Sequence, residues 1–291
     1  MKDLRNYLVL RKLLKDFLLE DIGTGDITTN SIISPNIRAV ARIICKADER
    51  SVVCGLEEAN TIFDICKCES EPLVKDGESI SAGITVMVIY GKAQCILMAE
   101  RTALNLLMRM SGIATATRYF LDILHKHEYS IRIACTRKTA PGLRFLDKRA
   151  VMMGGGDSHR MRLDDMILIK DNHLAVTKSI IRSIKLAKKN KGQSIRVECE
   201  VKNTNEAITA INAGADIIML DNFSPQEAKK TIEEIVRLEL RNKIEIEISG
   251  GITIDNILEY AEARPDIISI GHLTHSSKAI DFSLEIDSNS E

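Results

Sequence analysis

The sequence predicts an α/β protein in which a mixed α+β unit precedes a longer unit of regularly alternating strands and helices. Three observations lead to this class. Residues 38–90 hold β-branched segments divided by Asp-Gly and Gly turns. Beyond residue 112, short apolar segments alternate with polar segments of helical pattern, which is typical of parallel βα units. Finally, 291 residues of 45% hydrophobic composition can bury one large core or two moderate ones.

The first unit is expected to begin with an amphipathic helix over residues 3–20, where Leu14, Phe17 and Leu18 stand at helical spacing. The segment that follows, "EDIGTGDITTNSI", is rich in Gly, Asp and Thr and predicts a loop. Strands are then expected within residues 38–47, 71–80 and 84–91, with a helix over 56–65.

A long helical pattern over residues 95–127 is interrupted at Ser111-Gly112, where glycine would allow one helix to end and another to begin. We therefore place the domain boundary at this point. The first domain is predicted to span residues 1–111 and the second 112–271, with the tail 272–291 packing on the first.

The second unit contains six apolar segments that we expect to be parallel strands. They are "IRIAC", "MILIK", "IRVECEV", "DIIMLDN", "IEIEISGG" and "DIISIGH". A seventh, weaker strand is expected at "RAVMMGG". Helices are expected between them, for example over residues 204–214 and 224–238.

Polar groups follow the predicted strands repeatedly. Arg137 and Lys138 come after the first, Lys170 after the second, and Glu200 and Asp221 after later ones. If the strands close into a barrel, their carboxyl ends share one rim, which is where barrel enzymes assemble their sites.

The rim residues divide into groups by charge. The cations are Arg137, Lys138, His159, Arg160 and Lys170. Several cations in one low-dielectric mouth are unfavourable unless an anion neutralises them, so they predict a polyanionic ligand. Each cation taken alone could equally be a solvated surface residue.

Glu200 and Asp221 end successive predicted strands and can converge in one site. They could hold ribose hydroxyls or Mg²⁺, and could stabilise positive charge developing at an anomeric carbon. The alternative is a pair of internal salt bridges with Lys170 and Arg137. The "SGG" at residues 249–251 precedes a helical pattern, so its backbone N–H groups could receive a phosphate, although such turns often use glycine for conformation alone.

A run of three glycines at residues 154–156 precedes His159 and Arg160. Ordering glycine costs conformational entropy, so this run suggests that the backbone closely approaches a ligand or another segment. The alternative is a loop without a specific role. His125, His127 and His275 have no comparable context and are expected to be surface or packing residues.

Composition excludes several classes of protein. Lys plus Arg total 40 against 41 Asp plus Glu, so there is no global basic field for nucleic acid and any anion site is local. Seven scattered cysteines without a CxxC pair predict reduced thiols and a cytoplasmic protein, and a metal role for Cys66 and Cys68 is not expected. No apolar stretch is long enough to suggest a membrane span.

Eight motifs, in order, resemble those of the quinolinate phosphoribosyltransferase family. They are "ERTALN", "TRKTAPGLR", "GGGDSHRMRL", "ILIKDNH", "ECEVKN", "IIMLDN", "EISGGI" and "SIGHLTHS". The similarity runs from "LEDIGTGDITT" to "LTHS", which is nearly the whole chain. The family joins quinolinate to 5-phosphoribosyl 1-pyrophosphate and gives nicotinate mononucleotide, pyrophosphate and CO₂ in NAD biosynthesis.

The resemblance implies an N-terminal α/β sandwich and an incomplete, seven-stranded TIM-like α/β barrel, the type II phosphoribosyltransferase fold. It implies a homodimer, Mg²⁺ with the pyrophosphate substrate, and no organic cofactor. By motif, Lys138, Lys170, Glu200 and Asp221 would be catalytic, and Glu200 and Asp221 would also contact the ribose and the metal. The remaining substrate-binding residues would be Arg101 from the partner subunit, Thr136, Arg137, His159, Arg160, Ser249, Gly250, Gly251, Ser269, Ile270 and Gly271.

Two positions depart from the family pattern, namely Ser158, where Asn is frequent, and Arg162, where Gly is frequent. Both lie beside proposed ligand contacts, so they are expected to affect the shape of the pocket and not the type of reaction. Three other functions stay open: a related phosphoribosyltransferase for another heterocycle, a Schiff-base lyase that uses Lys170, and a non-catalytic sensor of a phosphorylated metabolite.

Overall fold

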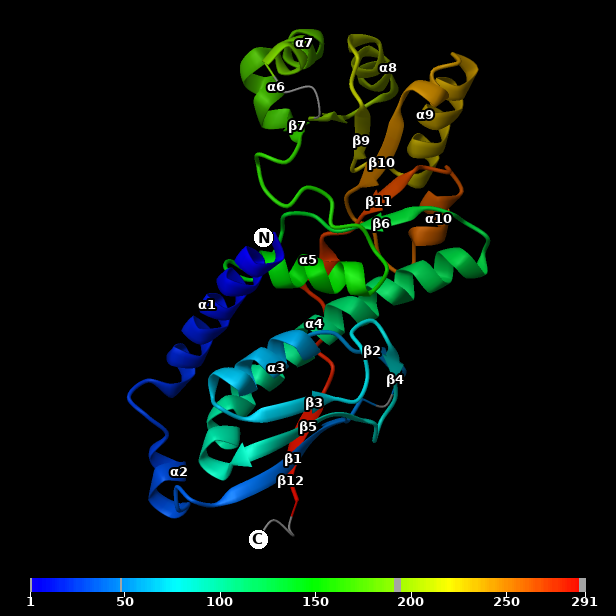
Figure 1. The fold of residues 1–291 in the computed structure, drawn as a ribbon. Coiled ribbons are helices and arrows are strands. Elements are labelled where there is room, and N and C mark those ends of the chain that lie inside the picture. The colour runs from blue at the N-terminus through cyan, green and yellow to red at the C-terminus, as the bar shows by residue number, and fades with distance from the viewer. Residues whose placement is uncertain (1, 48, 191–194, 288–291) are drawn as a thin grey trace. The chain divides into compact units, whose positions relative to one another are not determined.

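The computed structural model describes residues 2–47, 49–190 and 195–287. The chain folds as two compact units (Figure 1). One contains the chain up to Thr115 together with the segment from Ser277 onward, and the other is Ala116–Ser276. Among the described residues, no helix is both long and apolar enough to cross a membrane.

The first unit is built on an antiparallel sheet of four strands in the order β12-β1-β5-β3. Its strands are β1 (Arg38–Cys45), β3 (Glu69–Pro72), β5 (Thr85–Lys92) and β12 (Phe282–Ile286). The strands β2 (Ser51–Val52) and β4 (Ser79–Ile80) form a separate pair. Register is set in part by β12, whose Phe282 lies opposite Cys45 and whose Ile286 lies opposite Ala41.

Alternate residues of β1 are buried, so one face of this sheet belongs to the core. The helices α1 (Lys2–Ile22) and α3 (Leu56–Ile65) contact each other, and α3 also contacts β3. Leu14, Leu18 and Phe63 are almost fully buried on these helices. The helices predicted over residues 3–20 and 56–65 are therefore confirmed.

The predicted loop at residues 20–32 is wrong in its second half, where α2 (Ile27–Ile32) forms. The side chain of Asp26 accepts a hydrogen bond from Thr29 N at 2.9 Å and so caps the first turn. The Thr and Asn residues of this segment are typical of loops, which is why the pattern favours a loop. Asp26 at the start of such a segment is, however, also typical of a helix N-cap.

The predicted break at Ser111-Gly112 is also wrong, because α4 (Ala93–Lys126) is one continuous helix. Ser111 Oγ is buried, accepts from Cys54 N at 2.9 Å and donates to Cys54 O at 3.1 Å. A Cβ on Gly112 would lie 2.1 Å from Lys278 O. These two small residues therefore serve close packing inside the first unit and do not end the helix.

The second unit contains a parallel sheet of six strands in the order β6-β11-β10-β9-β8-β7. They are β6 (Arg132–Ala134), β7 (Ile167–Ile169), β8 (Val197–Val201), β9 (Ile217–Asp221), β10 (Glu245–Ser249) and β11 (Ile267–Ser269). The first strand of this unit, β6, pairs with its last, β11, so the sheet curls into a barrel that is open between β6 and β7. The α/β class and the barrel-like sheet are thus confirmed, as are the six strand positions.

The seventh strand expected at "RAVMMGG" is wrong, because residues 149–153 belong to the helix α5 (Arg144–Met153). Instead of a strand, Asp157 forms an isolated parallel β-bridge with Ala134 of β6. Alanine, valine and methionine are compatible with either element, and the glycines mark the end of a helix here and not of a strand.

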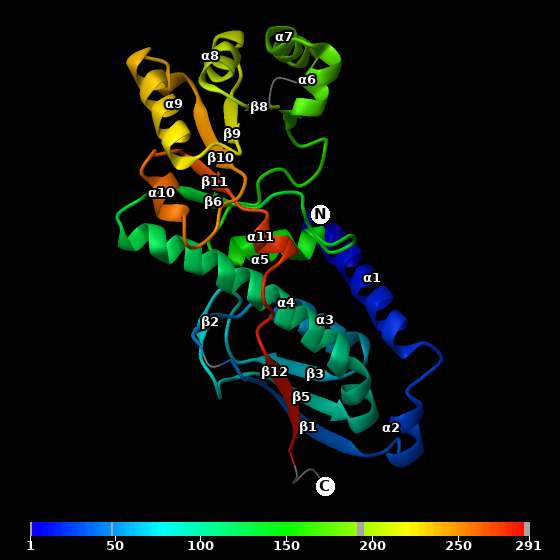
Figure 2. The same cartoon turned by 180° about the vertical axis from the view of Figure 1, so that it is seen from behind.

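The outer side of this sheet carries helices that cover its strands (Figure 2). In chain order the remaining helices are α6 (Asp171–Thr177), α7 (Ile180–Asn190), α8 (Thr204–Ala213), α9 (Pro225–Arg237), α10 (Ile257–Ala261) and α11 (His272–His275), with a 3₁₀ turn at Arg241–Lys243. Helix α9 begins with a capping box between Ser224 and Glu227, as the "SPQE" pattern indicates. The helices expected over residues 204–214 and 224–238 are confirmed.

Candidate functional site

The carboxyl ends of the parallel strands meet at one edge of the second unit. Ser249 of β10 lies in register with Asp221 of β9 and with Ser269 of β11. Ser269 is in turn opposite Ala134 of β6. Residues that are far apart in the sequence are thereby placed at the same level of the sheet.

A cavity of about 290 Å³, which we call the rim cavity, opens among these strand ends. Nine of the residues singled out in the sequence line it: Thr136, Arg137, Lys138, His159, Arg160, Lys170, Asp221, Ser249 and Ser269. Cys135, Leu168, Met219 and Glu247 complete the lining. The expected convergence on one rim therefore holds for the five cations and for Asp221, whereas Glu200 does not line the cavity.

Three polar atoms at the rim cavity are buried without a hydrogen-bond partner among the described residues, namely Arg137 Nε, Ser269 Oγ and Glu247 Oε1. Buried polar groups in proteins are nearly always hydrogen-bonded, so orphans beside a cavity indicate a ligand that completes them. Arg160 lies close enough to Arg137 that burial and then the Arg137 charge lower its pKa. Such mutual repulsion between guanidinium groups is relieved by an anion.

Glu200 is connected to the rim cavity through Lys170, which lines it. Lys170 Nζ donates to Glu200 Oε2 at 2.9 Å, and only 5% of the Glu200 side chain is exposed. Burial, followed by the charge of Glu200, raises the pKa of Asp221, while Lys170 and Lys138 oppose that rise. Glu200 therefore forms the internal salt bridge with Lys170 that was the alternative to a role in the site. Asp221 nevertheless lies near enough to Glu200 to interact with it electrostatically.

The predicted glycine turns have different structural roles. Gly250 has φ of 98°, and a Cβ there would lie 2.2 Å from Asn222 Oδ1, so close packing requires glycine. Gly251 has φ of 63° with open space around its Cβ position. The helix expected directly after this turn begins only at Ile257, so the idea of a phosphate at a helix N-terminus is wrong here. At this turn, only the backbone of a loop is available to a ligand.

The turn after β11 approaches the cations directly. A Cβ on Gly271 would lie 3.1 Å from Lys138 Cδ, and Ile270 N donates to Ala134 O at 2.8 Å. Ile270 is buried, so its contribution to this edge is its backbone and the tie to β6.

The glycines at 154–156 confirm close approach to another segment. A Cβ on Gly156 would lie 2.7 Å from Thr117 Cγ2 and 3.0 Å from Ile133 O. Ser158 O accepts from the Lys148 ammonium group, and the exposed Arg162 pairs with Asp164 at 3.2 Å. The two departures from the family pattern therefore lie on the loop that leads through His159 and Arg160.

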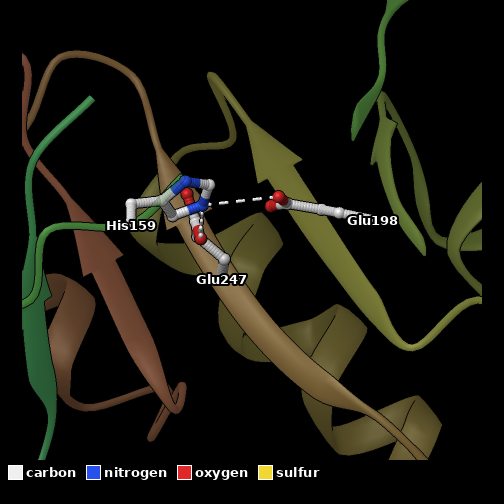
Figure 3. Close-up of side chains that lie close together, drawn as sticks. All are labelled: His159, Glu198 and Glu247. Atoms are coloured by element: carbon white, nitrogen blue, oxygen red, sulfur yellow. Dashed lines mark hydrogen bonds and ion pairs between the residues drawn. The ribbon is translucent and has the colours of Figure 1, made fainter. Parts of the chain in front are cut away.

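His159 is held by two buried glutamates that the sequence reasoning missed. Its Nε2 lies 3.1 Å from Glu247 Oε2 and 3.4 Å from Glu198 Oε2, and both carboxylates are fully buried (Figure 3). The signal was present, because Glu198 shares a strand face with Glu200, and Glu247 shares one with Ser249. Charged residues inside short apolar strands call for a partner.

These three side chains could in principle hold a metal ion, since their ligand atoms lie within 4.8 Å of one another. The geometry favours a proton instead. Burial lowers the pKa of His159, but hydrogen bonds and charge from Glu198 and Glu247 outweigh it and raise the pKa to about 10. Nε2 faces both carboxylates and carries a proton in the charged ring and in the neutral one; only in the neutral ring can Nδ1 accept the hydrogen bond that Arg160 N donates at 2.8 Å. Metal binding at Nε2 would require that proton to leave.

The remaining residues from the sequence reasoning lie elsewhere. Arg101 is on α4 in the first unit, with 59% of its side chain exposed. Cys66 and Cys68 are buried in the same unit, and burial first of all raises their pKa values to about 11 and about 12, as expected of inert thiols. His125 and His127 are exposed.

The fold and this site define an α/β barrel-like enzyme whose strand ends enclose a cavity lined by clustered cations. The chain belongs to the quinolinate phosphoribosyl transferase family: residues 26–111 match the model of its N-terminal domain and 113–285 that of its C-terminal domain. It is 46% identical over 277 residues to the "probable nicotinate-nucleotide pyrophosphorylase (carboxylating)" of Methanocaldococcus jannaschii, covering 94% of this chain and 96% of that one. The corresponding protein of Bacillus subtilis is 38% identical, with 98% and 96% covered.

Among solved structures, the nicotinate-nucleotide pyrophosphorylase of Francisella tularensis is similar with a TM-score of 0.87 and 35% identity, and 96% of each chain is covered. The structure of the Streptococcus pyogenes relative gives a TM-score of 0.88 at 34% identity, covering 96% of this chain and 97% of that one. The likeness therefore extends over both units.

Proposed function

We propose that this chain transfers the phosphoribosyl group of 5-phosphoribosyl 1-pyrophosphate to quinolinate and decarboxylates the product. Nicotinate mononucleotide, pyrophosphate and CO₂ are formed. The observation that carries the proposal is the rim cavity, where Arg137, Lys138, Arg160 and Lys170 face one space together with Asp221. A pyridine dicarboxylate supplies the negative charge that these cations lack, and a ribose supplies the hydroxyls that a carboxylate can accept from.

The chemistry follows from this division of charge. The ring nitrogen attacks the anomeric carbon while the bond to pyrophosphate breaks, and positive charge develops on the ribose. Asp221 and Glu200 stabilise that charge, whereas the cations fix the dicarboxylate and receive the departing pyrophosphate. In the second step the carbon–carboxyl bond next to the quaternised nitrogen breaks. Its electron pair stays on the ring, CO₂ leaves, and a proton takes its place.

Magnesium bound with the pyrophosphate substrate fits the donor set on this side of the rim cavity. Glu200 and Asp221 are two carboxylates within electrostatic reach of each other, and hard oxygen ligands with substrate oxygens are what Mg²⁺ prefers. The ion would supply charge neutralisation for the leaving group.

The 5-phosphate is assigned to the loop backbone at Ser249–Gly251 and Ser269–Gly271, with Thr136 nearby on the same rim. The unpartnered Ser269 Oγ supports this assignment, because a phosphate oxygen could accept from it. The exposed Arg101 is assigned to the site of a second copy of the chain in a homodimer, and a cytoplasmic location goes with the reduced thiols.

The test is a coupled assay with quinolinate, 5-phosphoribosyl 1-pyrophosphate and Mg²⁺ that measures pyrophosphate and CO₂ together. We expect equal amounts of the two products, a loss of at least about 100-fold in kcat/KM for Arg137→Ala, and no change for the exposed Arg237→Ala. Pyrophosphate without CO₂ would indicate another heterocycle as substrate. Binding of both substrates without turnover would indicate a sensor.

The shared-site proposal has its own test. Arg101→Ala and Arg137→Ala should each be inactive, and a mixture of the two should regain activity after subunit exchange. Mixed dimers contain one site with both arginines intact. A mixture as inactive as its components, with subunit exchange demonstrated, would refute a site shared between subunits.

A further inference from the structure

The loop that carries His159 and Arg160 has an unusual backbone. His159 has φ of 50°, a left-handed conformation that is sterically unfavourable for a residue with a side chain. Such a conformation persists only where surrounding contacts over-determine it. His159 N donates to Asp157 Oδ1 at 2.7 Å, which fixes the entry to the turn.

The carbonyl groups on either side of His159 converge on a single buried ammonium group. Lys148 Nζ donates to Arg160 O at 2.9 Å and also to Ser158 O. The Cys135 thiol also donates to Ser158 O, at 3.4 Å, and lies near this ammonium group.

Lys148 itself is fully buried on α5, which is rare for lysine. Burial is the largest influence on it and lowers its pKa, and the nearby charge of Arg144 acts in the same direction. Ordering such a group costs free energy that ordinary packing would avoid. The compensation visible in the structure is the turn it holds, since both carbonyl groups that accept from Nζ belong to the residues that flank His159.

Lys148 does not line the rim cavity, whereas His159 and Arg160 do. On the basis of the proposed function, we propose that Lys148 is a positioning residue for quinolinate binding. Its ammonium group holds the strained turn from which Arg160 presents its guanidinium group to the dicarboxylate. Glu247 and Glu198 in turn hold the His159 ring through Nε2.

The test uses Lys148→Met, which keeps the length and removes the donors, and Lys148→Gln, which keeps an uncharged donor. We expect KM for quinolinate to rise at least tenfold in the Met variant and less in the Gln variant, with KM for 5-phosphoribosyl 1-pyrophosphate changed less than threefold. Binding of quinolinate alone, measured by calorimetry, should weaken by the same factor. Leu146→Ala, at a buried apolar position of the same helix, is the control and should lower the melting temperature without changing either KM.

The outcomes separate the possibilities. If the Met variant does not fold, the Gln variant carries the test. If both KM values stay within threefold of wild type while the melting temperature falls, Lys148 is merely structural and the inference is overturned. If the wild-type protein itself neither binds nor converts quinolinate, the proposed function fails instead.

Discussion

Replacing Lys170 by methionine would test how much of the rim cavity's action is electrostatic. Lys170 Nζ lies 2.9 Å from Glu200 Oε2, and at an effective dielectric constant of about 20 two unit charges at that distance attract by roughly 6 kcal/mol. Because 46% of the Lys170 side chain is exposed, solvent screens much of this attraction. A net loss of about 2–4 kcal/mol is reasonable for truncating one partner of such a charge pair.

The methionine variant also leaves the nearly buried Glu200 as an uncompensated negative charge beside the space for the dicarboxylate. We therefore expect kcat/KM for quinolinate to fall about 30- to 900-fold, measured by pyrophosphate release. Lys229→Met is the control, because Lys229 pairs with Glu262 at 3.4 Å where both side chains are at least half exposed, and it should leave the rate unchanged. A Lys170→Met rate within threefold of wild type would refute the reasoning.

Lys170→Arg distinguishes this electrostatic role from a Schiff-base mechanism. Arginine restores the cation, so activity should recover to within about tenfold of wild type. A Schiff-base lyase would lose all activity with arginine, because guanidinium cannot form the imine. Mass gain at Lys170 after borohydride trapping with a carbonyl substrate would support that other mechanism.

Three further predictions follow from single positions. Burial, together with the charge of Glu247, raises the pKa of Glu198 to about 7, so the folded state binds this proton more tightly than the unfolded state and the free energy of unfolding should fall as pH rises from about 4.5 to about 7. Glu198→Gln should flatten that slope in urea titrations and be more stable than wild type above pH 7 by roughly 1–3 kcal/mol; an unchanged slope would contradict this assignment. Gly156→Ala should lower the free energy of unfolding by about 1–3 kcal/mol because its Cβ has no space, and an unchanged melting temperature would count against the described packing. Glu200→Gln removes a charge that raises the pKa of Asp221, so the acidic limb of the kcat/KM profile should move to lower pH; movement to higher pH would be inconsistent with the geometry.

The elements of the second unit could be predicted from sequence because apolar strands and capped helices alternate there with clear punctuation. The errors arose where one signal has two structural meanings. Ser111 and Gly112 suggested a helix end, yet a small residue inside a helix also permits close packing, which only the fold reveals. The apolar residues of the segment 149–153 are compatible with a strand and with a helix, and the length of the segment does not decide between the two.

The site shows a similar division. Arg137, Lys170, Asp221 and Ser249 were found because they stand at strand ends, where a parallel sheet brings them together. Glu198 and Glu247 lie two residues before Glu200 and Ser249 on the same strand faces. A search limited to strand ends therefore does not find them. Lys148 could not be found at all, because nothing in a helical pattern indicates that a lysine is buried beneath a neighbouring loop.

The pairing of β12 with β1 bears on the order of folding during synthesis. Residues 282–286 emerge from the ribosome after all of the barrel-like unit, yet they complete the sheet that residues 38–45 began. Until then β1 lacks a neighbour on that side, and an unsatisfied edge recruits other chains. Nascent chains stalled before residue 282 should therefore be the most dependent on chaperones, even though their catalytic half is already translated.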